Sequence, residues 1–345
     1  MDKAKTPIHL KAILIILILG LAAFVLYFYF FINPAQVVSI LSKINVTIYA
    51  GAFISYFLFT LCSALVWRQL LKNLSIKLSL RKSLLFTWVG LFFEAVVPQL
   101  GWSGEISKTY LLAKESNQDA SKIGATVVAQ KLFTITLTIV ALSTGLGSLL
   151  LSYHLPFIDS FFIVLILALS ILSLIIIYYV SVKPAATKTL LNVGIRIILF
   201  FRKIYDSQKL RERAEKFLGG YHSSIKQLGE NPKRFFKAII YAIVSFIFEI
   251  SVIFLSFYAL GQSVPISTVL IVFTLTGTLQ TVGITLLGFT EIVMTSIFSF
   301  LGVSVVLSFS VTLLSRIVTL WFRLIVSYIA LQWTGIRIIT KKPSA

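Results

Sequence analysis

Long unbroken apolar runs dominate this chain, and the polar positions collect between them. Six runs are long enough to cross about 30 Å of hydrocarbon as helices that rise 1.5 Å per residue. An amphipathic surface helix would instead show polar positions at every turn. The runs therefore predict transmembrane helices at 12–32, 46–66, 121–151, 157–182, 237–260 and 303–332.

Two further apolar stretches are interrupted. The first reads FFEAVVPQLGWSGEISKTY over residues 92–110, with Glu94 and Glu105 on either side of a Pro98–Gly101 break. Proline removes a backbone donor and glycine permits a turn, so the break has a local cause. The second interrupted stretch covers residues 267–302.

Composition supports a membrane protein. Hydrophobic residues make up 58% of the 345 positions and charged residues only 12%, so the fold class is an all-α polytopic integral membrane protein. The single cysteine excludes an internal disulfide and a multi-cysteine metal site. The three histidines are far apart in the sequence, and we expect neither a metal nor a cofactor.

The net charge of +19 is concentrated on one side of the predicted membrane. Residues 67–82 carry five cations, and residues 183–237 carry thirteen basic and four acidic residues. Such a one-sided excess follows the positive-inside rule, so we expect no nucleic-acid partner. It predicts a multi-pass protein of the cell membrane with both termini in the cytoplasm.

The positions of the basic loops constrain the interrupted stretches. Both 67–82 and 183–237 must be cytoplasmic, and two spans lie between residues 122 and 183. The segment 83–120 therefore leaves and returns on the same side, as a re-entrant hairpin. The same reasoning predicts a second hairpin at 267–302, although two full crossings would also satisfy it.

The two halves of the chain resemble each other. GWSGEISKTYLL (101–112) is followed by VVAQKLF (127–133), and LLGFTEIVM (286–294) is followed by VTLLSRIVTLWF (311–322). Glu105 precedes Lys131 by 26 residues, and Glu291 precedes Arg316 by 25. We predict one membrane domain over 1–345, built as an inverted-topology repeat: a first half at 1–151, a span and basic loop at 152–236, and the rest of the second half at 237–345.

Ionisable residues within the apolar segments are the candidate chemistry. A charge at the bilayer centre costs about 2.5–3.5 kcal/mol, so such a residue faces a partner or a cavity. Structural ion pairs that hold the hairpins, or a polar cavity for a charged headgroup, would each account for them, and the two can coexist. The embedded residues are Glu94, Glu105, Lys131, Glu249, Glu291, Arg316 and Arg323.

The basic segment 183–237 has an apolar first part and a basic second part. This pattern predicts a helix along the anionic inner leaflet, ended by Gly219 and Gly220; a solvated linker helix is the alternative. Asn231 and Pro232 are typical of the cap and first position of the next helix.

Known catalytic sequence patterns are absent. There is no GxSxG, HExxH or P-loop, so we expect no enzyme activity and no transport driven by ATP hydrolysis.

GWSGEISKTYLL, VVAQKLF, LGFTEIVM and LLSRIVTLWF together resemble the membrane region of the lysylphosphatidylglycerol synthase/flippase family over nearly the whole chain. The resemblance implies translocation of an aminoacylated or related phospholipid from the inner to the outer leaflet. Synthesis is not implied, because family members that synthesise the lipid use an extra soluble domain.

The family motifs match this sequence residue by residue, with departures. Lys108 stands where Arg is usual, and Gln130–Lys131 stands where Glu–Arg is usual. Thr134 and Thr290 replace an acid and an arginine, and Arg323 replaces a common proline.

We therefore expect a flippase-like transporter whose partners are membrane lipids, in which an aminoacylated or polyprenyl phospholipid headgroup passes between leaflets; a homo-oligomer is compatible with the sequence. A small-solute secondary transporter and a non-transporting partner of a lipid- or glycan-modifying enzyme are the alternatives. Glu94 and Glu249 are candidate structural charges. The candidate substrate-binding residues are Gly104, Glu105, Lys108, Tyr110, Gln130, Lys131, Gly288, Glu291, Arg316 and Arg323.

Overall fold

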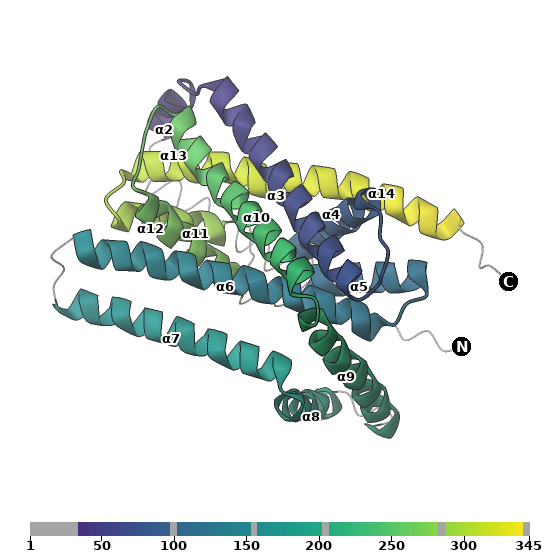
Figure 1. Cartoon of the computed structure of the whole chain (residues 1–345). Helices are drawn as coiled ribbons and strands as arrows, with labels where there is room; N and C mark the ends of the chain where they lie inside the picture. Colours follow the sequence, from purple (N-terminus) through teal and green to yellow (C-terminus); the bar gives the residue numbers. More distant parts are fainter. Residues whose placement is uncertain (1–33, 97–101, 153–156, 202–206, 282–287, 341–345) are drawn as a thin grey trace.

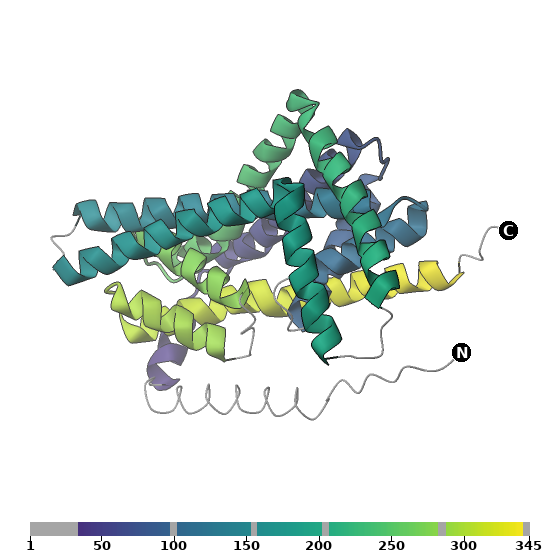
Figure 2. The same ribbon diagram turned by 90° about the horizontal axis from the view of Figure 1, so that it is seen from below.

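A computed structural model describes residues 34–96, 102–152, 157–201, 207–281 and 288–340, and the regular structure of these ranges is helical throughout. Figures 1 and 2 show the helices in two perpendicular views. The helices are α2 (Pro34–Leu41), α3 (Val46–Asn73), α4 (Leu80–Val96), α5 (Ser103–Ser116), α6 (Ala120–Ser152), α7 (Phe157–Val182), α8 (Pro184–Phe201), α9 (Ser207–Gly229), α10 (Pro232–Ala259), α11 (Ile266–Thr281), α12 (Phe289–Phe300), α13 (Val305–Arg316), the π-helix η1 (Ile317–Phe322) and α14 (Arg323–Thr340).

Five helical segments are long and apolar enough to cross a membrane. They agree with five of the six predicted spans and confirm an all-α polytopic membrane protein; the predicted span 12–32 lies outside the described residues. The five segments are Val46–Asn73, Ala120–Leu151, Ile163–Val182, Pro232–Ala259 and Val305–Thr334.

Asparagine caps fix where α3 and α10 begin. The Asn45 side chain accepts a hydrogen bond from the Ile48 N–H at 3.1 Å, and the Asn231 side chain accepts one from the Arg234 N–H at 3.2 Å. Pro232 occupies the first helical position, where its missing N–H costs nothing. The cap predicted at Asn231–Pro232 is confirmed.

Helices α3 and α10 pack side by side and antiparallel (Figure 1). The Ser55 hydroxyl donates to the Phe248 carbonyl at 2.8 Å, and the Ser245 hydroxyl donates to the Phe59 carbonyl at 2.9 Å. Small residues let the two backbones approach, and hydroxyls bonded across helices stabilise packing in an apolar surrounding. This is the most extensive contact between two helices in the described part of the chain.

Helices α4 and α5 form an antiparallel hairpin. Lys82 near the start of α4 pairs with Glu115 near the end of α5, and at the other end the Ser103 hydroxyl donates to the Phe93 carbonyl at 3.0 Å. Helices of 17 and 14 residues measure only ~25 and ~21 Å, less than the hydrocarbon thickness. The predicted break at 98–101 lies outside the described residues.

Helices α11 and α12 are likewise short, with 16 and 12 residues, and pack against each other. Gly288 precedes α12 with φ of 94°, a conformation that favours glycine. Its N–H donates to the Glu291 carboxylate at 2.9 Å, which caps the helix.

Each hairpin packs against a long helix of the other half. Helix α4 contacts α14, where the Phe92 and Tyr328 rings lie 6.1 Å apart. Helix α11 contacts α6, where a Cβ added to Gly145 would lie 2.9 Å from the Ile271 side chain. Within each half, α3 contacts α6 and α10 contacts α13, while the contact of α3 with α10 joins the two halves.

The segment 183–237 contains helices α8 and α9, and α9 packs on α6. The sequence predicted that Gly219 and Gly220 end a helix, but α9 continues through both to Gly229. Glycine at position 220 serves close packing instead of ending the helix, because a Cβ there would lie 2.2 Å from the Ser121 hydroxyl. This glycine therefore allows two helices to approach.

Candidate functional site

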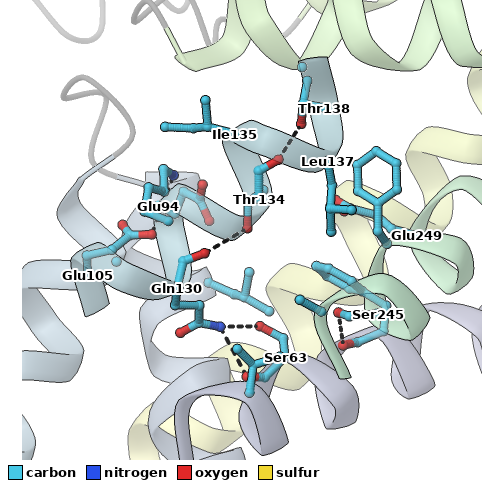
Figure 3. A pocket seen from close by; sticks show the side chains of 18 of the residues that line it. Ser63, Glu94, Glu105, Gln130, Thr134, Ile135, Leu137, Thr138, Ser245 and Glu249 are labelled. Carbon is cyan, nitrogen blue, oxygen red and sulfur yellow. Dashed lines mark hydrogen bonds and ion pairs between the residues drawn. The ribbon is translucent and has the colours of Figure 1, made fainter. Parts of the chain in front are cut away.

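A cavity of about 440 Å³ lies inside the bundle, with residues of α3 to α7, α10, α11 and α14 in its walls. This volume falls within the range of roughly 300–1,000 Å³ typical of small-molecule sites. Figure 3 shows carboxylates from α4, α5 and α10 around it. Three acids and three bases line the cavity: Glu94, Glu105, Glu249, Lys108, Lys131 and Arg323.

Glu105 and Lys131 form an ion pair across the α5–α6 contact. Their Oε1 and Nζ atoms are 3.4 Å apart, and each side chain is 15% exposed. Glu105 lies in the first turn of α5, where the helix dipole favours a negative charge. Its second oxygen, Oε2, is buried and has no hydrogen-bond partner among the described residues. One face of this carboxylate is therefore available to a ligand.

Lys108 lies one turn after Glu105 and is only 7% exposed. Its ammonium is 3.4 Å from the Gln130 side-chain oxygen and 5.5 Å from the centre of a Trp67 ring. The Gln130 amide donates to the Ser63 carbonyl and hydroxyl at 3.1 and 2.9 Å (Figure 3). These bonds fix the amide so that its oxygen can accept from Lys108. Both of these contacts of the buried cation are with neutral groups.

The cavity wall also carries Glu94, Glu249 and Arg323. The sequence assigned Glu94 and Glu249 a structural role, but both side chains line the cavity. Arg323 begins α14 directly after the π-helix η1, an irregularity often found at functional sites. Its guanidinium bonds the Tyr56 side chain, while its Nε atom is buried and has no hydrogen-bond partner among the described residues.

A second ion pair joins Glu291 and Arg316, the equivalent positions in the second half, but it lies away from the cavity. Arg316 Nε lies 2.6 Å from Glu291 Oε1, and the side chains are 13% and 7% exposed. Glu291 also caps α12 through the Gly288 N–H. Neither these three residues nor Tyr110, which is 62% exposed, lines the cavity.

The remaining candidates line the cavity or support its wall. Gln130 and Gly104 belong to the lining, and Gly104 packs against α4, where a Cβ would lie 2.6 Å from the Gly90 carbonyl oxygen. Sequence reasoning missed the hydroxyl groups along α6. Thr134 and Thr138 follow Gln130 at steps of four, and this helical spacing on one face could have indicated them.

No group of three or more metal-binding side chains occurs in the part of the chain that the structure describes. The cavity wall contains charged side chains, some of them paired and some with an unpartnered atom among the described residues, in an otherwise apolar bundle. Such a site can bind a ligand that carries charge.

The transmembrane region of lysylphosphatidylglycerol synthase is the family whose model matches, over residues 16–327. A UPF0104 membrane protein of Pyrococcus horikoshii is 24% identical over 296 residues, which cover 83% of this chain and 87% of that protein. A UPF0104 membrane protein of Methanocaldococcus jannaschii is 25% identical over 325 residues, with 89% and 91% covered. No solved structure gives a significant match.

Proposed function

Because the chain belongs to the family of the lysylphosphatidylglycerol synthase transmembrane region, we propose that it is a transporter, not an enzyme, and that it moves a phospholipid headgroup between the two leaflets of the cell membrane. The observation that carries the proposal is the charged cavity within apolar helices. Six ionisable groups at membrane depth are costly unless they are paired or meet a charged ligand.

The unpartnered atoms indicate what kind of ligand fits. Glu105 Oε2 can accept from a cationic or hydroxyl donor, and Arg323 Nε can donate to an anionic oxygen. A lipid headgroup that carries a phosphate and a hydroxyl or amino group supplies both kinds of partner as it passes through the cavity. The hydrocarbon chains need no polar partner and can stay in the bilayer.

We also propose that the two halves form an inverted repeat. The pairing of α4 with α14 and of α11 with α6 is the exchange expected when two similar halves meet about an axis in the membrane plane. In this arrangement the two short hairpins enter from opposite sides, and transporters built this way bind substrate where the halves meet. The basic segment 183–237 then faces the cytoplasm, where α8 and α9 would contact anionic lipid.

The full chain reconstituted into vesicles tests this function. The vesicles contain phosphatidylethanolamine and phosphatidylglycerol with a trace of headgroup-labelled lipid, and a membrane-impermeant quencher reports labelled lipid in the outer leaflet. We expect the protected fraction to fall faster with protein than in protein-free vesicles. Replacement of Arg323 by Gln should slow this loss of protected lipid by about tenfold. That is the factor for one charged hydrogen bond of roughly 1.4 kcal/mol.

The same vesicles distinguish the alternatives. A small-solute transporter would release an entrapped labelled amino acid or sugar and leave the lipid label unmoved. A non-transporting partner of another enzyme would change neither signal. Either result contradicts lipid translocation.

A further inference from the structure

An apolar groove of about 260 Å³ lies between α6 and α7, next to the charged cavity. Its walls are formed by side chains such as Val128 and Leu132 on α6 and Ile176 and Val180 on α7, and Trp102 before α5 also lines it. Since nearly all of these side chains are apolar, the groove suits hydrocarbon better than a polar solute.

The groove and the cavity are neighbours. Lys131, Ile135 and Ile177 line both of them. A molecule could therefore occupy the two spaces at once, with a polar part in the cavity and an apolar part in the groove.

The groove lies at an exposed apolar edge of the bundle. Helix α7 packs mainly against α6 and α8, and none of the apolar window within Ile163–Val182 is buried. Figures 1 and 2 both show α6 and α7 side by side along one edge. Ile176, in the groove wall, is itself 52% exposed. A hydrocarbon chain in the bilayer can thus reach the groove sideways.

Lys131 marks the boundary between the polar and the apolar space. Its ammonium lies 3.4 Å from Glu105 on the cavity side and 5.8 Å from the centre of a Trp102 ring on the groove side. In a phospholipid the phosphate joins the headgroup to the chains. A cation at this boundary is therefore in position to contact the phosphate of a lipid that occupies both spaces.

We propose that the α6–α7 groove is the lateral portal for the hydrocarbon chains of a phospholipid whose phosphate binds at Lys131 and whose headgroup enters the cavity. This inference rests on the proposed function and specifies its substrate as a lipid with a phosphate next to its chains. A water-soluble substrate would leave the groove without an occupant.

Two neighbouring isoleucines provide a matched test. Ile176 lines the groove, whereas Ile175 does not line it and is 59% exposed, since consecutive helical positions point about 100° apart. In the vesicle assay with headgroup-labelled phosphatidylethanolamine, Ile176→Trp should slow translocation about tenfold, the factor given by ~1.4 kcal/mol. Ile175→Trp should transport at the wild-type rate. Equal rates for wild type and both variants would overturn the portal and leave the proposed function standing.

Crosslinking tests the portal without relying on transport. The single native cysteine is replaced (Cys62→Ala), and a photoreactive label is attached to a cysteine at 175 or 176. Lipid that merely surrounds the protein reacts at both positions whatever residue 131 is. A chain held in the portal requires the phosphate contact, so Lys131→Gln should reduce the yield of crosslinked lipid severalfold at 176 only. An unchanged yield at 176, or an equal loss at 175, would refute the proposal even if wild type moves no lipid.

Discussion

The two Glu–cation pairs, Glu105–Lys131 and Glu291–Arg316, have spacings that differ by one residue but have different surroundings. Glu291 uses one oxygen for Arg316 and the other for the Gly288 N–H, so its carboxylate is fully occupied. Glu105 uses one oxygen for Lys131, and its second oxygen is buried without a partner among the described residues. A buried pair is costly unless its remaining lone pairs are satisfied. We therefore interpret Glu105–Lys131 as a ligand site and Glu291–Arg316 as a structural pair.

Gly104 illustrates how a predicted site residue can act through packing. Its absent side chain lets α5 approach the Gly90 carbonyl of α4, because a Cβ at 104 would lie only 2.6 Å from that oxygen. We expect Gly104→Ala to push the hairpin apart and to lower the free energy of unfolding by about 1–3 kcal/mol. Thermal melting of the purified protein measures this as a lower Tm.

Gly147 is the matched control for that substitution. It lies within α6 with nothing within 4 Å of an added Cβ, so Gly147→Ala should leave the Tm unchanged or raise it slightly through better helix propensity. Equal Tm values for the two alanine variants would show that the close approach of α4 and α5 does not limit stability.

The sequence predicted the residues of both ion pairs but not which pair faces the cavity. Spacing within a motif identifies equivalent positions, whereas the face that a side chain presents depends on how the hairpins pack. Glu94 is the opposite case, because the sequence did not indicate that its side chain would line the cavity. Its sequence position suggested only a role in holding the hairpin, and the contact between α4 and the neighbouring helices brings it into the cavity wall.

At the scale of elements, charge distribution and helix breaks predicted most of what the structure contains. The long spans after residue 46 appear as helices, and both interrupted stretches appear as pairs of short helices. The end of α9 was missed, because a Gly–Gly pair on a helix surface has the same sequence signal whether it ends the helix or allows close packing. Only the contact of Gly220 with Ser121 distinguishes the two.

The re-entrant path of the α4–α5 hairpin can be tested by cysteine accessibility. In a Cys62→Ala background, single cysteines at Arg81, Gln118 and Ser263, all exposed, are labelled with a membrane-impermeant reagent in right-side-out and inside-out vesicles. We expect 81 and 118 to be labelled from the cytoplasmic side and 263 from the opposite side. Labelling of 81 and 118 from opposite sides would mean that the hairpin crosses the membrane.

At the scale of the whole molecule, both halves of the chain contribute to the charged cavity. Each hairpin packs on a long helix of the other half, and the charged cavity is lined from both halves, with Glu105 and Lys131 from the first and Glu249 and Arg323 from the second. A movement of one half relative to the other would therefore change the surroundings of the cavity. That coupling is what alternating access to two leaflets requires.

The most direct test compares Glu105→Gln with Glu291→Gln in the lipid translocation assay. Both substitutions remove the acid of a buried ion pair, and both should lower the Tm, but only Glu105 faces the cavity. Below the melting temperature of both variants, we predict that Glu105→Gln slows translocation about tenfold or more, as expected for the loss of a charged hydrogen bond of ~1.5–3 kcal/mol. Glu291→Gln should keep the wild-type rate. Wild-type rates for Glu105→Gln, or an equal loss in both variants, would contradict the assignment of the cavity as the headgroup path.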